Sequence, residues 1–218
     1  MLTESDCGVP KSERILEEVV QAMADMVDVR DPYTARHQYS VAQLSVEIGR
    51  QLGISDWQIK GVQQAATIHD IGKLYVPSEI LCKPGKLNVS EFDLIKLHPQ
   101  IGHRILKGIE FLWPVAQIVL QHHERVNGSG YPDGLSSDNI LIESKILSVA
   151  DVIEAMSSDR PYRPALGINA ALEEIVKNKS ILYDDQVVEA CLSVFAKKPI
   201  KISENIQDSF MYPAALAF

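Results

Sequence analysis

The sequence has few of the features that would place it outside ordinary globular proteins. It has no apolar run of the ~18–20 residues needed to span a bilayer. Its N-terminus lacks the basic start and apolar stretch of a secretion signal. The cysteines Cys7, Cys82 and Cys191 are too widely separated to form a disulfide framework or a CxxC metal site. We therefore expect no membrane span and a cytoplasmic, reducing compartment.

Positive charge is also scarce. The chain has 21 Lys and Arg against 29 Asp and Glu, which gives a net charge of −8 and a pI near 5.2. A general binder of DNA or RNA needs a basic footprint, so polymeric nucleic acid is excluded as a partner. The 218 residues are 46% hydrophobic and 23% charged, which is enough to bury the core of one domain.

No stretch alternates with the period of two that is typical of a half-buried β-strand. Apolar residues recur at helical spacing instead, so we predict an all-α fold with a single domain of about seven to nine helices over residues 12–198. Residues 1–11 are expected to be a flexible N-terminus and 199–218 a C-terminal tail. Helices are predicted at 12–29, 31–52, 55–69, 90–107, 114–123, 142–158, 168–178 and 184–197. The apolar stripe of the first helix is expected to pack onto this domain, and the alternative is a linker or dimer helix.

Four of these helices carry a histidine on their apolar face. His37, for example, is in register with Val41, Leu44 and Ile48. A lone histidine on an apolar face is usually a hydrogen-bonded core residue, but four buried imidazoles without a shared partner would each lose solvation. A common metal centre would satisfy all four, which are His37, His69, His98 and His122.

Two carboxylates belong with these histidines. Asp70 directly follows His69, and Asp151 lies in an otherwise apolar helical segment with no basic residue one turn away. Imidazole and carboxylate ligands without thiolates suit iron, manganese or zinc, and the oxygen ligands favour the harder ions. Two ions bridged by Asp70 could hydrolyse a phosphoester. The candidate ligands are His37, His69, Asp70, His98, His122, His123 and Asp151.

An ordered series of short motifs resembles the HD-GYP domain over roughly residues 12–180. The central ones are His69-Asp70-Ile71-Gly72-Lys73, His122-His123-Glu124 and Gly128-Ser129-Gly130-Tyr131-Pro132. The others are Pro77 with 83–87, His98-Pro99 with Gly102, Val149-Ala150-Asp151-Val152 and Arg160-Pro161-Tyr162-Arg163.

The resemblance implies a helical HD-superfamily domain, with a metal centre in the bundle core, that hydrolyses cyclic di-GMP. The products would be linear pGpG, GMP or both, formed by a bridging hydroxide at a binuclear centre. The family's metal ligands match all seven candidates. Two divalent ions, Fe or Mn ahead of Zn, are expected, with Asp70 and Lys73 in catalytic roles. Lys73, Tyr131, Arg160 and Arg163 are expected to bind substrate.

The same resemblance suggests protein partners. Diguanylate cyclase domains could dock on the loop that contains Tyr131, and a homodimer is also compatible with the pattern. Two other functions stay open. One is a low-activity cyclic-dinucleotide sensor or cyclase-docking module, and the other is a hydrolase of a related cyclic dinucleotide.

Three positions depart from the family pattern. Tyr33 stands where three-metal members carry Glu, which favours a binuclear centre. Ser40 replaces a frequent Arg, which removes a potential contact. Asn127 replaces a frequent Asp, but either side chain can cap a turn.

Overall fold

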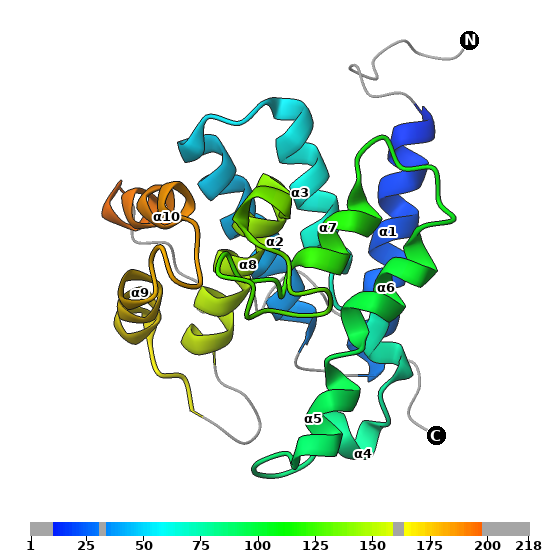
Figure 1. Cartoon of the computed structure of the whole chain (residues 1–218). Coiled ribbons are helices and arrows are strands. Elements are labelled where there is room, and N and C mark those ends of the chain that lie inside the picture. Colours follow the sequence, from blue (N-terminus) through cyan, green and yellow to red (C-terminus); the bar gives the residue numbers. More distant parts are fainter. Residues whose placement is uncertain (1–10, 31–33, 159–163, 198–218) are drawn as a thin grey trace, which may run out of the picture.

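The computed structural model describes residues 11–30, 34–158 and 164–197. The all-α prediction is confirmed, because these residues form α-helices and short 3-10 helices, and their only β-type pairings are isolated bridges at Asn127–Ser136 and Lys179–Tyr183. Figure 1 shows the helices as a bundle, with α4 and α5 projecting at one end. Within the described ranges, no helix is long and apolar enough to cross a membrane.

The helices follow the predicted order, except that the one predicted over 90–107 is divided in two and several short helices were not predicted. They are α1 (Lys11–Arg30), α2 (Thr34–Leu52), α3 (Asp56–Ile68), η1 (Ile71–Tyr75), α4 (Ser78–Leu81), α5 (Val89–Ile95), α6 (His98–Leu106), α7 (Val115–Gln121), η2 (Ser137–Asn139), α8 (Ile142–Ser157), α9 (Ile168–Lys177) and α10 (Asp185–Lys197).

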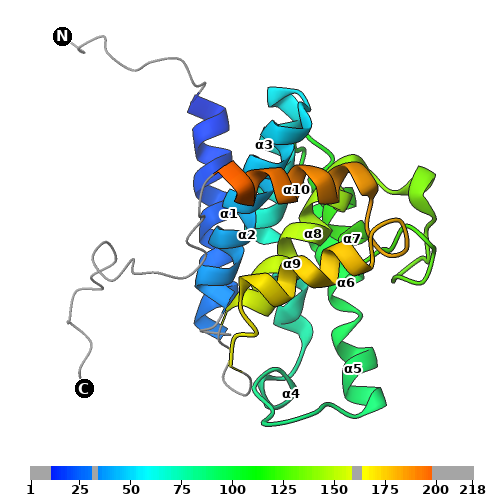
Figure 2. The same cartoon turned by 90° about the vertical axis from the view of Figure 1, so that its left-hand side faces the viewer.

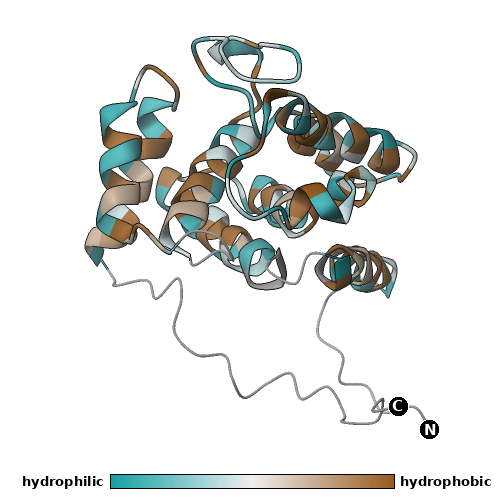
Figure 3. Cartoon of the chain, turned by 90° about the horizontal axis from the view of Figure 1, so that it is seen from below, coloured by the Kyte–Doolittle hydropathy of each residue, from teal (hydrophilic) through white to brown (hydrophobic). Residues whose placement is uncertain are grey.

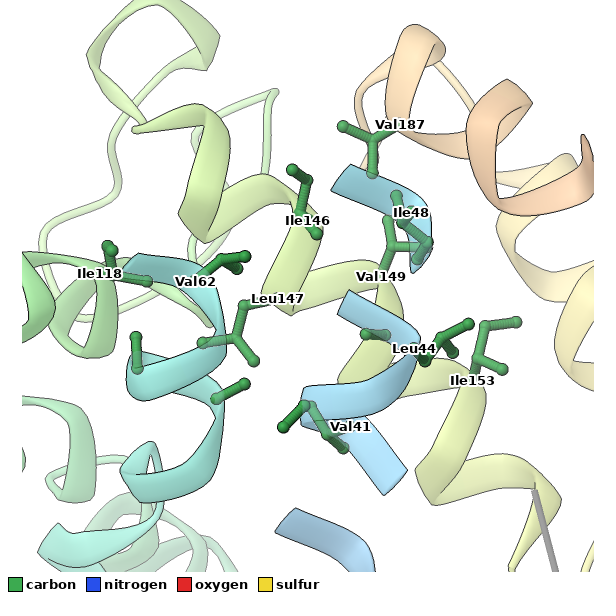
Figure 4. Packing of buried hydrophobic residues seen from close by; sticks show 14 of the residues in the cluster. Val41, Leu44, Ile48, Val62, Ile118, Ile146, Leu147, Val149, Ile153 and Val187 are labelled. Carbon is green, nitrogen blue, oxygen red and sulfur yellow. The ribbon is translucent and has the colours of Figure 1, made fainter. Parts of the chain in front are cut away.

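The core lies where α2, α3 and α8 meet. The predicted face of α2 is confirmed, because Val41, Leu44 and Ile48 are all buried. Figure 4 shows these side chains beside residues of α8 such as Val149 and Ile153. Each buried side chain of this size contributes about 1.5–3 kcal/mol relative to an exposed one. Figure 3 shows that helices of the bundle carry both hydrophobic and hydrophilic residues.

The start of α3 is fixed by a capping box at the predicted beginning of the helix. Ser55 is the N-cap, its side chain accepts the Gln58 backbone N–H, and the Gln58 side chain accepts the Ser55 backbone N–H in return. This capping box satisfies two amide groups that the first turn leaves unpaired. It fixes the N-terminal end of α3, whereas His69 lies at the C-terminal end.

The single helix predicted over 90–107 is wrong. The chain forms α5 and α6 with a break between them, and the capping box of α5 pairs Asn88 with Glu91 rather than starting at Ser90. Pro99 lies in the first turn of α6, where its missing N–H leaves no helical hydrogen bond unmade, whereas inside one long helix it would break one. His98 therefore begins a helix instead of lying mid-way along one.

The apolar stripe of α1 packs onto the domain only in part. Val20, Ala24 and Val27 are buried, whereas Val19 and Met26 are exposed. The cause is that apolar residues occupy two faces of the helix, and the bundle covers one of them. Figures 1 and 2 both place α1 at an edge of the bundle.

Candidate metal centre

The seven predicted ligands converge from α2, α8 and the ends of three other helices. Two sets have one ligand atom per residue, and these atoms lie within 4.8 Å of one another. The mixed group contains His37, His69 and Asp70, and the histidine group contains His98, His122 and His123. Asp151 joins the mixed group, with Oδ1 3.2 Å from His37 Nε2.

Backbone carbonyls at helix ends orient three of the imidazoles. The Nδ1 atoms of His69, His98 and His122 lie 2.8, 2.8 and 2.6 Å from the carbonyl oxygens of Ala66, Ile95 and Val119. Each carbonyl is three residues earlier, in a last turn where helical carbonyls lack an amide partner. Because a carbonyl oxygen only accepts hydrogen bonds, Nδ1 must carry the proton. In the neutral ring Nε2 then presents a lone pair to the centre.

The histidine group brings two such lone pairs together. His98 Nε2 and His122 Nε2 are 3.2 Å apart, and both rings are buried. With both Nδ1 protons already donated to carbonyls, neither Nε2 has a proton to offer the other. Two acceptors this close can share one cation placed beside them. The donor set therefore fits a metal ion, for which neutral imidazole is a preferred ligand.

Asp70, a member of the mixed group, also faces the histidine group. Its Oδ1 is 3.6 Å from His98 Nε2, while its Oδ2 is 3.6 Å from His69 Nε2 and 3.8 Å from His37 Nε2. One oxygen thus faces each group. This arrangement suits a carboxylate shared by two metal ions.

His37 is held by carboxylates rather than by a carbonyl. Its Nδ1 hydrogen-bonds to Glu154 of α8, and its Nε2 faces Asp151 one turn earlier on the same helix. Ser158 donates a further hydrogen bond of 2.6 Å to Glu154. A carboxylate behind a metal-binding imidazole fixes its orientation. Sequence analysis missed Glu154, although a second carboxylate three residues after Asp151 in an apolar helix was a usable signal.

The mixed group carries charge. Burial opposes the charged form of His37, but hydrogen bonds to Asp151 and Glu154 outweigh it and raise the pKa of His37 to about 9. Burial likewise opposes ionisation of the two aspartates. The Lys73 ammonium nevertheless holds the pKa of the Asp70 carboxyl well below its usual range, and His37 does the same for the pKa of Asp151.

The histidine group is uncharged. Burial lowers the pKa of His98 to about 4 and that of His122 to about 3. Burial also lowers the pKa of His123, and the neighbouring His122 adds to the effect. All three rings are therefore neutral near pH 7, which is the form that binds a metal ion.

A close backbone approach sets the distance between the two groups. A Cβ placed on Gly72 would lie 1.9 Å from the carbonyl oxygen of His98 and 2.8 Å from the Gly102 nitrogen, so only glycine allows η1 and α6 to touch. Gly102 in turn faces Val119, where an added Cβ would be 3.0 Å from Cγ1. Both glycines belong to the recognised motifs, but their packing role could not be read from the sequence.

The loop between α7 and α8 places Tyr131 over His123. The two ring centroids are 4.8 Å apart with the planes at 30°. Glu124 is buried and anchors the loop, because its carboxylate accepts the backbone N–H groups of Asp133 at 2.7 Å and Leu135 at 2.9 Å. Asn127 caps a turn by accepting the Ser129 amide at 3.0 Å, as the sequence predicted.

The remaining predicted residues fall into three sets. Lys73 reaches the centre, with Nζ 2.6 Å from Asp70 Oδ2. Arg160, Arg163 and Tyr33 lie outside the described residues. Ser40 lines a groove of about 720 Å³ on the outer side of α2, and none of the seven candidate ligands lines that groove. The centre is therefore identified by its donors and not by an open cavity.

Comparison with known proteins agrees with this geometry. The cyclic di-GMP phosphodiesterase response regulator RpfG of Xanthomonas campestris pv. campestris is 38% identical over 177 residues, which are 80% of this chain and 47% of RpfG. A cyclic di-GMP phosphodiesterase of Thermotoga maritima is 41% identical over 184 residues, which are 84% of this chain and 50% of that protein. The chain thus spans about half the length of these curated relatives.

A solved structure shares the fold. It is a cyclic GMP-AMP specific phosphodiesterase from Vibrio cholerae, with a TM-score of 0.57 and 32% identity, and the match covers 88% of this chain and 43% of the other. A family model described as HD domain matches residues 21–187, a range that includes all seven candidate ligands. This confirms the family predicted from the motifs: the chain belongs to the HD domain family.

Proposed function

We propose that the chain is a metal-dependent phosphodiesterase that hydrolyses cyclic di-GMP. The observation that carries the proposal is the pair of His98 and His122 Nε2 atoms 3.2 Å apart, both without a proton, with Asp70 facing them across the centre. A cation site of this kind, repeated on the other side of Asp70, suits phosphoester hydrolysis. Two relatives at 38% and 41% identity are named cyclic di-GMP phosphodiesterases, which supports the choice of substrate.

The proposed cofactor is a pair of divalent ions. The mixed group and Asp151 would hold one, the histidine group would hold the other, and Asp70 would contact both. Fe or Mn is proposed ahead of Zn, because carboxylate oxygens supply part of the ligand set. When bound, such ions act as Lewis acids and lower the pKa of water, which is the chemistry that phosphodiester hydrolysis requires.

The chain's own residues would position the substrate. Lys73 holds its ammonium at the edge of the centre, where it would neutralise charge on a phosphate oxygen. Tyr131 presents a ring beside the histidine group, which suits stacking with a guanine base. Arg160 and Arg163 are proposed at the second phosphate or a guanine edge, as forked guanidinium groups favour. Water cleaves one P–O bond to give linear pGpG, and cleavage of the second phosphodiester gives GMP.

A second candidate function has a specific observation behind it. The Vibrio cholerae neighbour acts on cyclic GMP-AMP, which differs from cyclic di-GMP in one base. The metal ligands and Lys73 contact no base in this proposal, so they do not separate the two dinucleotides. A low-activity sensor that docks diguanylate cyclases through the Tyr131 loop is a further alternative. The proposed compartment is the cytoplasm, where cysteines that form no disulfide, such as Cys82 and Cys191, stay reduced.

The test is a hydrolysis assay with defined metal content. The purified chain is loaded anaerobically with Fe(II) or Mn(II), its metal stoichiometry is measured, and cyclic di-GMP or 3′3′ cyclic GMP-AMP is added. We expect about two ions per chain and conversion of cyclic di-GMP to pGpG or GMP, read by chromatography. Faster turnover of cyclic GMP-AMP would select the related hydrolase. Binding of cyclic di-GMP without any product from the loaded protein would select the sensor.

A further inference from the structure

Helix α1 carries a second apolar stripe that faces away from the bundle. Ile15, Val19, Met26 and Val29 are 48%, 46%, 59% and 79% exposed, and Ala22 between them is exposed as well. Their spacing along the helix is four, three, four and three residues. Figure 2 shows α1 at the edge of the bundle.

This pattern differs from ordinary surface exposure. Single apolar residues on a protein surface are common and need no explanation. Here all five positions of one outward-facing stripe along a 20-residue helix are apolar. This stripe is additional to the inner face formed by Val20, Ala24 and Val27. The four-three spacing is the heptad repeat of a two-stranded coiled coil.

We propose that α1 pairs with α1 of a second copy of this chain in a parallel coiled coil. The seam places Val19 and Met26 at a positions, and Ile15, Ala22 and Val29 at d positions. The occupant of the exposed face is thus identical to the face itself, as in a symmetric two-fold dimer.

Charge complementarity favours the parallel direction. In a parallel pair, a g position lies beside the e position five residues later in the partner helix, which places Asp25 opposite Arg30 twice by symmetry. In an antiparallel pair, g positions lie beside g positions of the partner helix. Glu18 and Asp25 both occupy g positions, so acidic side chains would face each other there and repel. All three side chains are exposed and available for such contacts.

The intramolecular contacts of these residues leave room for the pairing. Arg30 donates to the carbonyl oxygen of Val76 at 3.2 Å through Nη2, but a guanidinium has five N–H donors. Asp25 accepts from Gln21 Nε2 at 2.8 Å, and an ionised carboxylate accepts several hydrogen bonds. No candidate metal ligand lies on α1, so each protomer would keep its own centre.

The first test measures the mass of the full chain in solution across a dilution series. We expect a dimer whose dissociation constant rises by more than about tenfold in Met26→Glu, because the charge would be buried at an a position. Leu112→Glu is the matched control, since Leu112 is 63% exposed and lies outside α1. A wild-type chain that stays monomeric overturns the proposal, and so does a dimer that both substitutions weaken equally.

The second test establishes direction. Val29→Cys is introduced in a background with Cys7→Ser and Cys82→Ser, while Cys191 is left in place because it is fully buried. A parallel seam brings the two introduced thiols together, and oxidation crosslinks the dimer. An antiparallel seam would separate them by about 20 Å at 1.5 Å per residue. A dimer that resists crosslinking therefore contradicts the parallel pairing.

A charge exchange provides an independent check of the same direction. Asp25→Arg or Arg30→Asp alone should weaken the dimer, and the two together should restore it, because the attraction between positions 25 and 30 is then rebuilt with reversed signs. Absence of restoration would contradict the proposed Asp25–Arg30 contact.

Discussion

The mixed group and the histidine group meet at Asp70, but the pKa of His37 is shifted in the opposite direction from the pKa values of His98 and His122. In the mixed group, hydrogen bonds to Asp151 and Glu154 overcome burial and raise the pKa of His37 to about 9. In the histidine group, burial outweighs the attraction of Asp70 and lowers the pKa of His98 to about 4, and it lowers the pKa of His122 to about 3. The same residue type thus has two charge states within one centre because of its neighbours.

This difference gives the two groups different relations to a cation. The histidine group is neutral and its lone pairs already converge, so a cation can bind without displacing a proton. In the mixed group, the proton of His37 and the ammonium of Lys73 already balance the carboxylates, and a metal ion must replace part of that charge. We therefore expect metal binding to depend on pH more strongly in the mixed group.

The largest effect is expected from Asp70→Ala, which removes the carboxylate that faces both groups. Loss of both ions should lower hydrolysis by more than roughly 10³-fold, because the metal-supplied nucleophile and charge stabilisation disappear together. Metal analysis and the chromatographic assay measure the two losses. Asp93→Ala, at an exposed Asp93–Lys96 ion pair of 2.9 Å, is the control. A variant that kept both ions and full activity would show that Asp70 does not join the groups.

A smaller but still large effect is expected from Gly72→Ala. The added Cβ would meet the His98 carbonyl at 1.9 Å, so η1 and α6 must move apart and carry the two groups with them. We expect a loss of about 3 kcal/mol or more in the free energy of unfolding, measured with urea. Gly108→Ala is the control, because nothing lies within 4 Å of its Cβ position. Equal stability of the two variants would contradict the close approach.

Glu154→Gln should weaken one group and leave the other intact. Losing the carboxylate behind His37 is expected to lower the affinity of the mixed group for Mn(II) by about 10–100-fold, which a calorimetric titration resolves. The histidine group should bind as before. Glu143→Gln is the matched control, since Glu143 is buried on the same helix but pairs with Gln58 at 3.0 Å. Equal weakening of both sites would mean that the groups do not act separately.

The smallest effect concerns the metal-free protein and has opposite signs in the two groups. His98 and His122 have lowered folded pKa values, so they contribute stability above pH 6.5 that is lost as the pH falls toward about 4. His37 has a raised folded pKa, so it contributes stability below pH 6.5 that is lost as the pH rises through about 9.

Urea midpoints measured against pH separate these contributions. His122→Asn should flatten the acid side of the profile, and His37→Asn should flatten the alkaline side. If either substitution changed the opposite side, the assignment of charge to the two groups would be wrong.

The sequence indicated which residues converge, but it did not indicate how the fold brings them together. The face of α2 that carries His37 follows from helical periodicity, because Val41, Leu44 and Ile48 repeat at the spacing that a buried face requires. The sequence predicted His98 within one continuous helix, because the apolar periodicity continues from α5 into α6. The break before His98, which leaves Pro99 in the first turn of α6, does not interrupt that pattern. Burial of Glu154 behind His37, 117 positions apart, and the contact of Gly72 with α6 depend on tertiary packing, which a local pattern does not encode.

The most direct test of the central claim is an anomalous difference map from crystals of the chain grown with Mn(II). The account predicts two peaks, one beside His37, His69 and Asp151 and the other beside His98, His122 and His123, with the Asp70 carboxylate between them. A single peak, or a map in which the His98–His122 pair coordinates nothing, would contradict it.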